Sequence, residues 1–197
     1  MSEEQEKYVA GQSFCGLDLS LTSTGFCLKN GSTITIDTIK TEPKNFKNDL
    51  DRLIHIRNTI ISKLPADVKM VCIEDFFIPS NKLQIGSGIK LAMLGTTIRL
   101  SLYERGIPFV IVSPNSLKKH ILGKGVGDKC MVVREVFKKY GIDVKDDNQA
   151  DASVLAYLAE HISQALSGKK MDDIPKYQQE VISGLLSSIG DRGYNLQ

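Results

Sequence analysis

The chain has 197 residues, of which 42% are hydrophobic and 24% charged, and its formal net charge is +2. It has neither an apolar run of about 18 residues nor a hydrophobic amino-terminal segment, so we expect a soluble, cytoplasmic protein with no membrane span. A chain of this length buries enough surface to fold without disulfides or a structural metal. The four cysteines stand singly, with no Cys-x-x-Cys pair, and are predicted to be reduced core thiols.

Residues 1–12 are polar and acid-rich, which predicts a disordered arm. Short apolar segments bounded by turn residues then predict five β-strands, at residues 14–19, 24–29, 32–39, 68–73 and 108–112. Asn30-Gly31, between the second and third strands, is a strong hairpin signal. The first three strands are therefore predicted to form an antiparallel meander.

Apolar residues at three- and four-residue steps predict helices at residues 45–64, 89–105, 114–122, 129–140, 148–166 and 174–189. Ser113-Pro114 and Asp128 are typical helix starts, and Gly106 and Gly141 typical ends. The order of elements predicts one α/β domain over residues 13–168, in which helices flank a mixed five-stranded sheet. Residues 169–197 are predicted to form a C-terminal helical tail.

Two predicted strands each carry an acid near the carboxyl end. Asp18 lies in an apolar strand, where an ionised carboxylate is costly unless a cation or a donor compensates it. The alternative is that Asp18 caps the following turn. Glu74 ends a second apolar strand, and α/β sheets usually place their sites at such ends. Asp75 is predicted to point to the opposite face and to be solvated.

More acids gather at the start of the predicted helix 148–166. Asp146 and Asp147 need no functional explanation, because the helix dipole favours acids at a helix start and both can simply cap the helix. Asp151 precedes small residues that indicate close packing on the sheet, and helical spacing puts Asp147 or Asn148 on its face. Carboxylates without His or Cys suit Mg²⁺ or Mn²⁺. Two such ions would activate water and stabilise the leaving oxygen in phosphodiester hydrolysis.

Positive charge is concentrated between residues 118 and 139, where seven Lys or Arg residues face two acids, a local net charge of +5. Lys138 and Lys139 are interpreted as a solvated helix face. The segment Gly123-Lys124-Gly125-Val126-Gly127 opens onto a helix N-terminus, which lets backbone amides approach phosphate closely. It lacks the spacing of a nucleotide-binding loop. Phosphate of a nucleic-acid backbone is therefore its expected ligand.

Four motifs in this order resemble the RuvC family of Holliday junction resolvases, within the RNase H-like superfamily. The resemblance covers residues 14–161. The motifs are Gly16-Leu17-Asp18 with Thr24-Gly25-Phe26, Ile73-Glu74-Asp75-Phe76-Phe77, the basic segment of residues 116–129, and Gln149-Ala150-Asp151-Ala152. The resemblance implies an RNase H-like fold, a homodimer, and paired nicking of four-way or other branched DNA junctions in recombination, repair or phage DNA processing. It also implies two Mg²⁺ or Mn²⁺ ions per active site.

By the resemblance, Asp18, Glu74 and Asp151 are catalytic metal ligands. The family's usual acid three residues before the last Asp is here Asn148, and Asp147 is the expected substitute as fourth catalytic ligand. The family also usually has Pro-Gly after the first Asp, where this chain has Leu19-Ser20. These departures are typical of a divergent, phage-type member.

The resemblance also assigns contacts with DNA. Phe77 is expected to contact the junction, and Lys118 and Lys129 to lie near the scissile phosphate. Lys119 and Lys124 are expected to bind junction phosphates around the glycine-rich loop.

Three alternatives remain open from the sequence. One is another RNase H-like nuclease that cuts RNA:DNA hybrids or branched DNA. The second is an actin-like or sugar-kinase-like phosphotransferase. Asp18 and residues 22–25 also resemble the first phosphate-binding hairpin of that class. The third is a DNA-binding protein whose active site has decayed.

Overall fold

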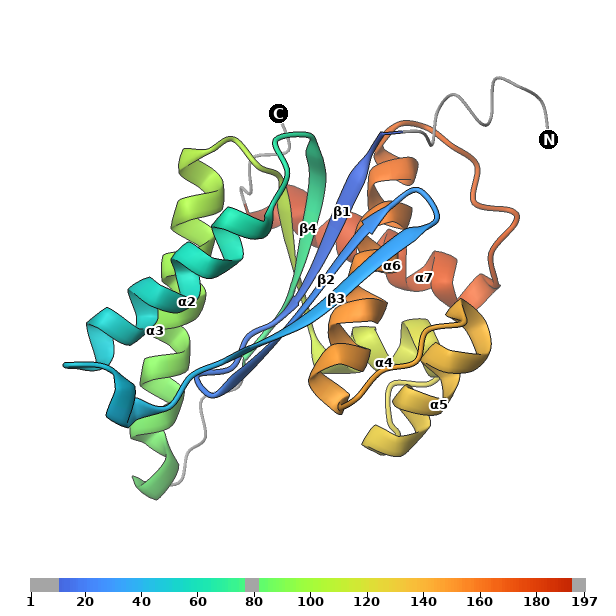
Figure 1. The fold of residues 1–197 in the computed structure, drawn as a ribbon. Helices are drawn as coiled ribbons and strands as arrows, with labels where there is room; N and C mark the ends of the chain where they lie inside the picture. The colour runs from blue at the N-terminus through green and yellow to red at the C-terminus, as the bar shows by residue number, and fades with distance from the viewer. Residues whose placement is uncertain (1–10, 77–81, 193–197) are drawn as a thin grey trace.

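A mixed five-stranded sheet runs through the centre of the molecule (Figure 1), as the sequence predicts. The structure is a computed structural model that describes residues 11–76 and 82–192. Nearly all of the arm predicted at residues 1–12 lies outside this range. The strands are β1 (Ser13–Asp18), β2 (Ser23–Asn30), β3 (Thr33–Lys40), β4 (Val68–Glu74) and β5 (Phe109–Val112).

The strands lie in the order β3-β2-β1-β4-β5. β1, β2 and β3 form the predicted antiparallel meander, and Gly31 adopts a φ of +56° in the hairpin between β2 and β3. β1, β4 and β5 are parallel. Because β1 and β4 are adjacent and parallel, their carboxyl ends, Asp18 and Glu74, lie at the same edge of the sheet.

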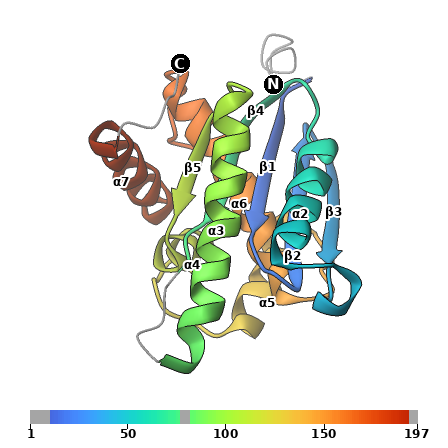
Figure 2. The same ribbon diagram turned by 90° about the vertical axis from the view of Figure 1, so that its left-hand side faces the viewer.

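Helices cover both faces of the sheet. α2 and α3 pack on one face, and α4, α5 and α6 lie on the other with α7 outside them (Figures 1 and 2). The helices are α2 (Asp49–Lys63), α3 (Lys82–Glu104), α4 (Pro114–Leu122), α5 (Lys129–Tyr140), α6 (Asp147–Leu166) and α7 (Lys176–Arg192), with a short 3-10 helix at Pro43–Asn45. Within the described residues, none of the helices has the length and hydropathy needed to cross a membrane.

Two helices begin four or more residues away from their predicted starts, and the other starts differ by at most two residues. α2 begins at Asp49 rather than at residue 45, because the side chain of Asn48 accepts a hydrogen bond from the Asp51 amide and caps the helix there. α3 begins at Lys82, well before the predicted residue 89. The sequence pattern does not predict the first turns of α3, because Gly86 and Gly88 lie in them. Glycine is a poor helix former and adds nothing to an apolar stripe.

Two glycines let α6 approach the sheet closely. A Cβ atom on Gly16 would lie 2.0 Å from the Ala152 carbonyl oxygen, and one on Gly25 would lie 2.1 Å from the Asn148 carbonyl oxygen. Real side chains do not tolerate such distances, so the close contact of α6 with β1 and β2 requires glycine at both positions. It brings the first turns of α6 beside the carboxyl end of β1.

The four cysteines are free thiols, and three of them are buried as predicted. The prediction is wrong for Cys130, which is exposed. The apolar stripe of α5, which includes Val132 and Val136, points into the core. Cys130 lies two residues before Val132, and two residues turn the helix by about 200°, so its side chain points away from the core.

Two histidines pack together between α4 and α6. His120 is fully buried, and its ring centroid lies 5.4 Å from that of His161 on α6. Burial, with smaller contributions from His161 and Lys139, lowers the pKa of His120 to about 3. Burial also lowers the pKa of His161. Both rings are therefore neutral in the folded protein at neutral pH.

We expect His120 to make the fold sensitive to acid. The pKa of His120 is lower in the folded state than the value of about 6.5 in an unfolded chain. The folded protein therefore has its full stability above about pH 6.5, and it loses stability as the pH falls below that value and the unfolded chain takes up a proton at His120. Between about pH 7 and pH 5, the free energy of unfolding should fall by about 2 kcal/mol more in the wild type than in His120→Leu. Urea unfolding at both pH values measures this difference. His55→Leu, at an exposed position on α2, should behave as wild type. Equal losses in the wild type and His120→Leu would contradict the prediction.

Candidate active site

Three acids converge at one edge of the sheet. Asp18 is the last residue of β1, Glu74 the last of β4, and Asp151 lies in the second turn of α6. One carboxylate oxygen from each lies within 4.8 Å of the others. The structure thus brings together the three acids that the sequence analysis identified on separate elements.

The start of α6 is fixed by a set of local hydrogen bonds. Asp146 caps the helix by accepting from the Gln149 amide at 2.8 Å, and the Gln149 side chain accepts from the Lys145 amide at 2.9 Å. The side-chain nitrogen of Asn148 donates to the Ser23 carbonyl oxygen at 2.7 Å. This last bond ties α6 to the first residue of β2, the strand that pairs with β1, so α6 and β1 hold their acids in a fixed relation.

The three carboxyl groups are crowded and largely removed from water. Burial, and then the neighbouring charge of Glu74, raise the pKa of Asp18 to about 9 and that of Asp151 to about 7. Burial also raises the pKa of Glu74. Such a cluster of like charges is unfavourable by itself, and a bound cation would relieve the repulsion.

The ligand atoms available at this edge suit a hard divalent cation. Asp18, Glu74 and Asp151 offer carboxylate oxygens, which Mg²⁺ and Mn²⁺ prefer over nitrogen or sulfur. These three residues would hold the ion, which, when bound, supplies an activated water and positive charge for phosphodiester hydrolysis.

The acids line a pocket of about 330 Å³ that also contains two lysines. Lys118 comes from the middle of α4, and Lys129 is the first residue of α5. Positive charge from both lysines counteracts the upward shift in the pKa of Glu74. The remaining lining residues are Leu19, Ser20, Pro114, Val132, Asp147 and Asn148. The pocket thus combines a metal-type carboxylate group with cations that suit a phosphate.

Asp147 lines this pocket but is not part of the three-carboxylate group. Its carboxylate forms an ion pair with Lys129, and this hydrogen bond lowers the pKa of Asp147. Asn148, the other candidate, uses its side-chain nitrogen to bind Ser23. The fourth ligand therefore stays a prediction.

We expect Asp147→Asn to damage cleavage more than Asn148→Ala, because a divalent cation gains more from a charged oxygen than from a neutral amide. The loss for Asp147→Asn should be about tenfold or more, the usual effect of weakening a metal site. Single-turnover cleavage measured across a titration of Mg²⁺ tests the order of the two variants. The reverse order would move the fourth ligand to Asn148.

Two other predicted DNA-binding residues, Lys119 and Lys124, do not line this pocket. Lys119 forms an ion pair with Glu180 of α7 at 2.8 Å and lines a different cavity. Lys124 is exposed in the loop between α4 and α5. Phe77 lies outside the described residues. Its neighbour Phe76 packs on α3, where its ring lies 2.8 Å from the place a Cβ atom of Gly95 would occupy.

Two charged residues interpreted as solvated have specific partners. Asp75 does point away from the acidic pocket, and its carboxylate lies 3.6 Å from the Arg99 guanidinium on α3. Lys139 donates to the Ile121 carbonyl oxygen and also bonds the Tyr177 hydroxyl at 2.9 Å. The partners of both residues come from other elements, and no local sequence signal announces them.

The sheet order and the position of the acids together define an RNase H-like fold with a carboxylate active site. A model of the family described as crossover junction endodeoxyribonuclease RuvC matches residues 14–159 of the chain. The chain belongs to the RuvC family. Its acidic triad suits the metal-dependent nuclease chemistry of that family.

Individual relatives agree with this assignment. The crossover junction endodeoxyribonuclease RuvC of Bifidobacterium adolescentis is 29% identical over 153 residues, which are 72% of this chain and 75% of the relative. A structure of Thermus thermophilus RuvC superposes with a TM-score of 0.61 at 21% identity, covering 80% of this chain and 97% of that one. T. thermophilus RuvC in complex with Holliday junction substrate gives 0.63 at 18% identity, covering 80% and 96%. These two structures support the fold.

Proposed function

We propose that this protein is a structure-selective endonuclease that resolves four-way or other branched DNA junctions by paired nicking, in recombination, repair or phage DNA processing. The observation that carries the proposal is the pocket in which Asp18, Glu74 and Asp151 meet Lys118 and Lys129. Membership of the RuvC family supports the choice of a junction as substrate. We infer that the protein acts in the cytosol of a bacterium or of a phage-infected host.

We propose two Mg²⁺ or Mn²⁺ ions per active site, held by Asp18, Glu74 and Asp151 with Asp147 as the fourth ligand. The triad supports one ion directly, because its oxygens already lie within reach of a single cation. Asp147 lines the same pocket and forms an ion pair with Lys129. If Lys129 left this ion pair to bind a DNA phosphate, the Asp147 carboxylate would be free to bind a metal ion. A second ion would then stabilise the leaving oxygen.

The basic segment is proposed to hold the DNA backbone, with Lys118 and Lys129 nearest the scissile phosphate. Both lysines face the acids, so they can bind a phosphate that is also bound to metal. Lys124 is proposed to contact phosphates farther from the cut, and Phe77 to contact bases. Lys119 would have to leave Glu180 before it could contact DNA.

We expect Lys118→Ala and Lys129→Ala each to lower the salt slope of junction binding by about one unit, because each removes one phosphate contact. Both variants should also slow cleavage at saturating DNA, since a fixed positive charge beside the reacting phosphate is lost. Lys138→Ala, on the exposed face of α5, is the control. If Lys138→Ala changes the salt slope as much as Lys118→Ala does, the basic segment is a general basic surface and not a specific phosphate-binding site.

We also propose that the protein acts as a homodimer whose two copies meet through α3. Four large apolar residues of this helix are 41–60% exposed, and with Thr96 they follow one another at steps of four, three, four and three residues. They are Ile89, Met93, Leu100 and Tyr103. This is the spacing of a two-helix seam. The helix lies on the outside of the molecule (Figure 2).

A second copy of the chain is the occupant that best suits this face. Exposed Leu50 and Ile54 widen it on α2, whose Asp49 pairs with Lys90 of α3. Paired nicking supplies the functional reason, because two strands of a junction cut together need two active sites in one complex.

The proposed function is tested with synthetic substrates: a four-way junction, a linear duplex and an RNA:DNA hybrid, each with Mg²⁺ or with EDTA. We expect Mg²⁺-dependent nicks at symmetry-related positions of the junction, leaving ends that a ligase can join, and much slower cleavage of the duplex. Preferential cleavage of the hybrid would instead support an RNase H-like nuclease of different specificity. Cleavage undiminished in EDTA would contradict the metal site.

A further inference from the structure

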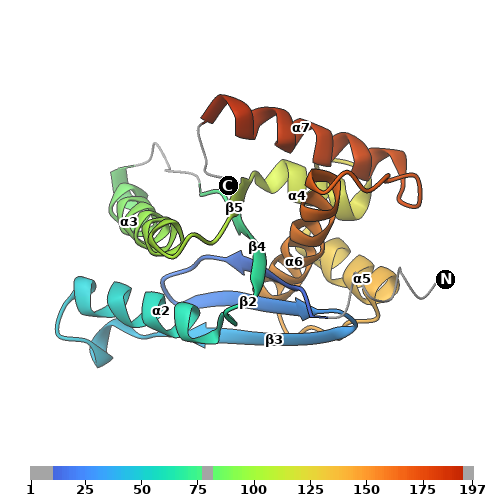
Figure 3. The ribbon, with the colours of Figure 1, turned by 90° about the horizontal axis from the view of Figure 1, so that it is seen from above.

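The C-terminal helix α7 lies beyond the residues that match the family model. The family model ends at residue 159, within α6, whereas α7 spans Lys176–Arg192. The helix nevertheless packs on the nuclease domain, lying across α4 and α6 (Figure 3). Val181, Ile182 and Leu185 are buried in the same core cluster as residues of α4, α5 and α6. α7 is therefore an integral part of the domain.

α7 makes polar contacts with the last turn of α4. The final carbonyl groups of a helix have no partner within the helix and need one from outside. The side-chain nitrogen of Gln178, a buried residue, donates to the His120 carbonyl oxygen at 2.9 Å. Lys139 donates to the Ile121 carbonyl oxygen and is itself bonded to the Tyr177 hydroxyl at 2.9 Å. Two free carbonyls of α4 are thus satisfied by α7 or with its help.

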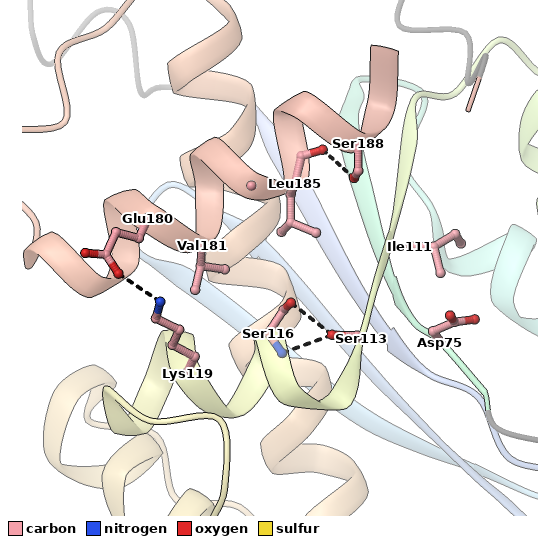
Figure 4. Close-up of a pocket in the computed structure, with 10 residues that line it drawn as sticks. Asp75, Ile111, Ser113, Ser116, Lys119, Glu180, Val181, Leu185 and Ser188 are labelled. Atoms are coloured by element: carbon pink, nitrogen blue, oxygen red, sulfur yellow. Dashed lines mark hydrogen bonds and ion pairs between the residues drawn. The ribbon is translucent and has the colours of Figure 1, made fainter. Parts of the chain in front are cut away.

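Two more contacts extend this attachment. Glu180 binds Lys119 at 2.8 Å across the cavity between α7, α4 and β5 (Figure 4). The ring of Tyr177 lies against Gly123, with ring carbons 3.7 Å from the place a Cβ atom of Gly123 would occupy. Gly123 ends α4 in the left-handed conformation, with a φ of +78°, and begins the glycine-rich loop. α7 therefore contacts both the last turn of α4 and the start of that loop.

The preceding turn of the same short helix carries an active-site lysine. Lys118 lines the acidic pocket, whereas its neighbours Leu117 and Ile121 are buried in the core. α4 has nine residues, so a shift of its last turn moves Lys118 as well. Displacements of about 1 Å at a catalytic group are enough to slow a reaction by up to about 100-fold.

We propose that α7 is a positioning element of the active site, in which Gln178 and Tyr177 fix the end of α4 and thereby hold Lys118 toward the scissile phosphate. The inference rests on the proposed junction cleavage and on the role of Lys118 in it. Gln178 and Tyr177 are positioning residues, since neither lines the pocket and both act through groups on other elements.

A double-mutant cycle on the full-length protein tests the proposal. Gln178→Met keeps the length of the side chain but removes the donor to His120, and should reduce single-turnover cleavage of a four-way junction about tenfold. In a Lys118→Ala background, Gln178→Met should have almost no further effect, because the residue through which it acts is gone. Tyr177→Phe, which removes only a hydroxyl, should give a smaller loss with the same coupling.

A control separates positioning from loss of stability. Ile60→Val lies in the core cluster on the other face of the sheet and should lower the melting temperature without slowing single-turnover cleavage. The proposal would be overturned if the loss of cleavage rate in the double variant were the product of the losses in Gln178→Met and Lys118→Ala alone. It would also be overturned if Gln178→Met cleaved at the wild-type rate. If Gln178→Met does not fold, Tyr177→Phe decides by the same comparison. A wild-type protein that cuts no junction would contradict the proposed function itself, a result distinct from independent losses.

Discussion

Asp18→Asn, Glu74→Gln and Asp151→Asn are each expected to reduce junction cleavage by about 1000-fold or more, while junction binding stays close to that of the wild type. Each substitution removes a charge that holds metal, and none removes a lysine that contacts phosphate. Binding and catalysis should therefore separate in all three variants.

The same substitutions should stabilise the metal-free protein. The pKa of Asp18 is raised to about 9 and that of Asp151 to about 7, mainly by burial and then by the neighbouring Glu74. At neutral pH both groups ionise freely in the unfolded chain but not in the fold, so their burial together opposes folding. A neutral amide relieves the repulsion and should increase the free energy of unfolding by about 1–2 kcal/mol, as is common when strain at an active site is removed. Mn²⁺ should raise the melting temperature of the wild type much more than that of the variants.

Three measurements check these expectations: single-turnover cleavage, junction binding in Ca²⁺ or EDTA, and thermal unfolding with and without Mn²⁺. Asp75→Asn is the matched control, because Asp75 adjoins Glu74 in sequence but pairs with Arg99 outside the acidic pocket. It should cleave at the wild-type rate. If any one of the three variants keeps near wild-type turnover, the residue it replaces is not a catalytic metal ligand.

The sequence was sufficient to predict the sheet and the meeting of Asp18 with Glu74. Both inferences rest on local rules: apolar segments mark buried strands, and acids at strand ends gather at one edge of a parallel sheet. The approach of Asp151 rests on more than such rules. Gly16 and Gly25 must face α6 for the helix to come close, and only the packed structure shows which element faces a glycine.

The limits of sequence reasoning are clearest in the basic segment. A run of lysines predicts positive charge but not which lysine faces which neighbour. Lys118 points into the pocket, whereas the next residue, Lys119, binds Glu180, which lies 61 residues away in sequence. Lys129 pairs with Asp147 because α5 and α6 begin side by side, which is a tertiary relation. The same holds for the contacts of α7, which no repeat or motif indicates.

The other large effect is expected from the exposed face of α3. Leu100→Glu should convert a dimer to monomers, with the dimer dissociation constant rising about 100-fold or more, because the charge would have to be buried in the seam. Leu100 is 54% exposed in the single chain, so the substitution should leave the fold of each monomer intact. Sedimentation over a range of protein concentrations measures the change.

The loss of the dimer should alter the products of cleavage more than the rate of the first nick. On a supercoiled plasmid that extrudes a cruciform, a dimer makes both nicks within one binding event and yields linear DNA. A monomer makes a single nick, which relaxes the plasmid and reabsorbs the junction, so nicked circles should accumulate. Leu166→Glu, at a 48% exposed position at the end of α6, should yield linear DNA as the wild type does. A Leu100→Glu variant that remains dimeric would move the interface away from α3. A monomeric variant that still yields linear DNA would show that paired nicking does not need two copies.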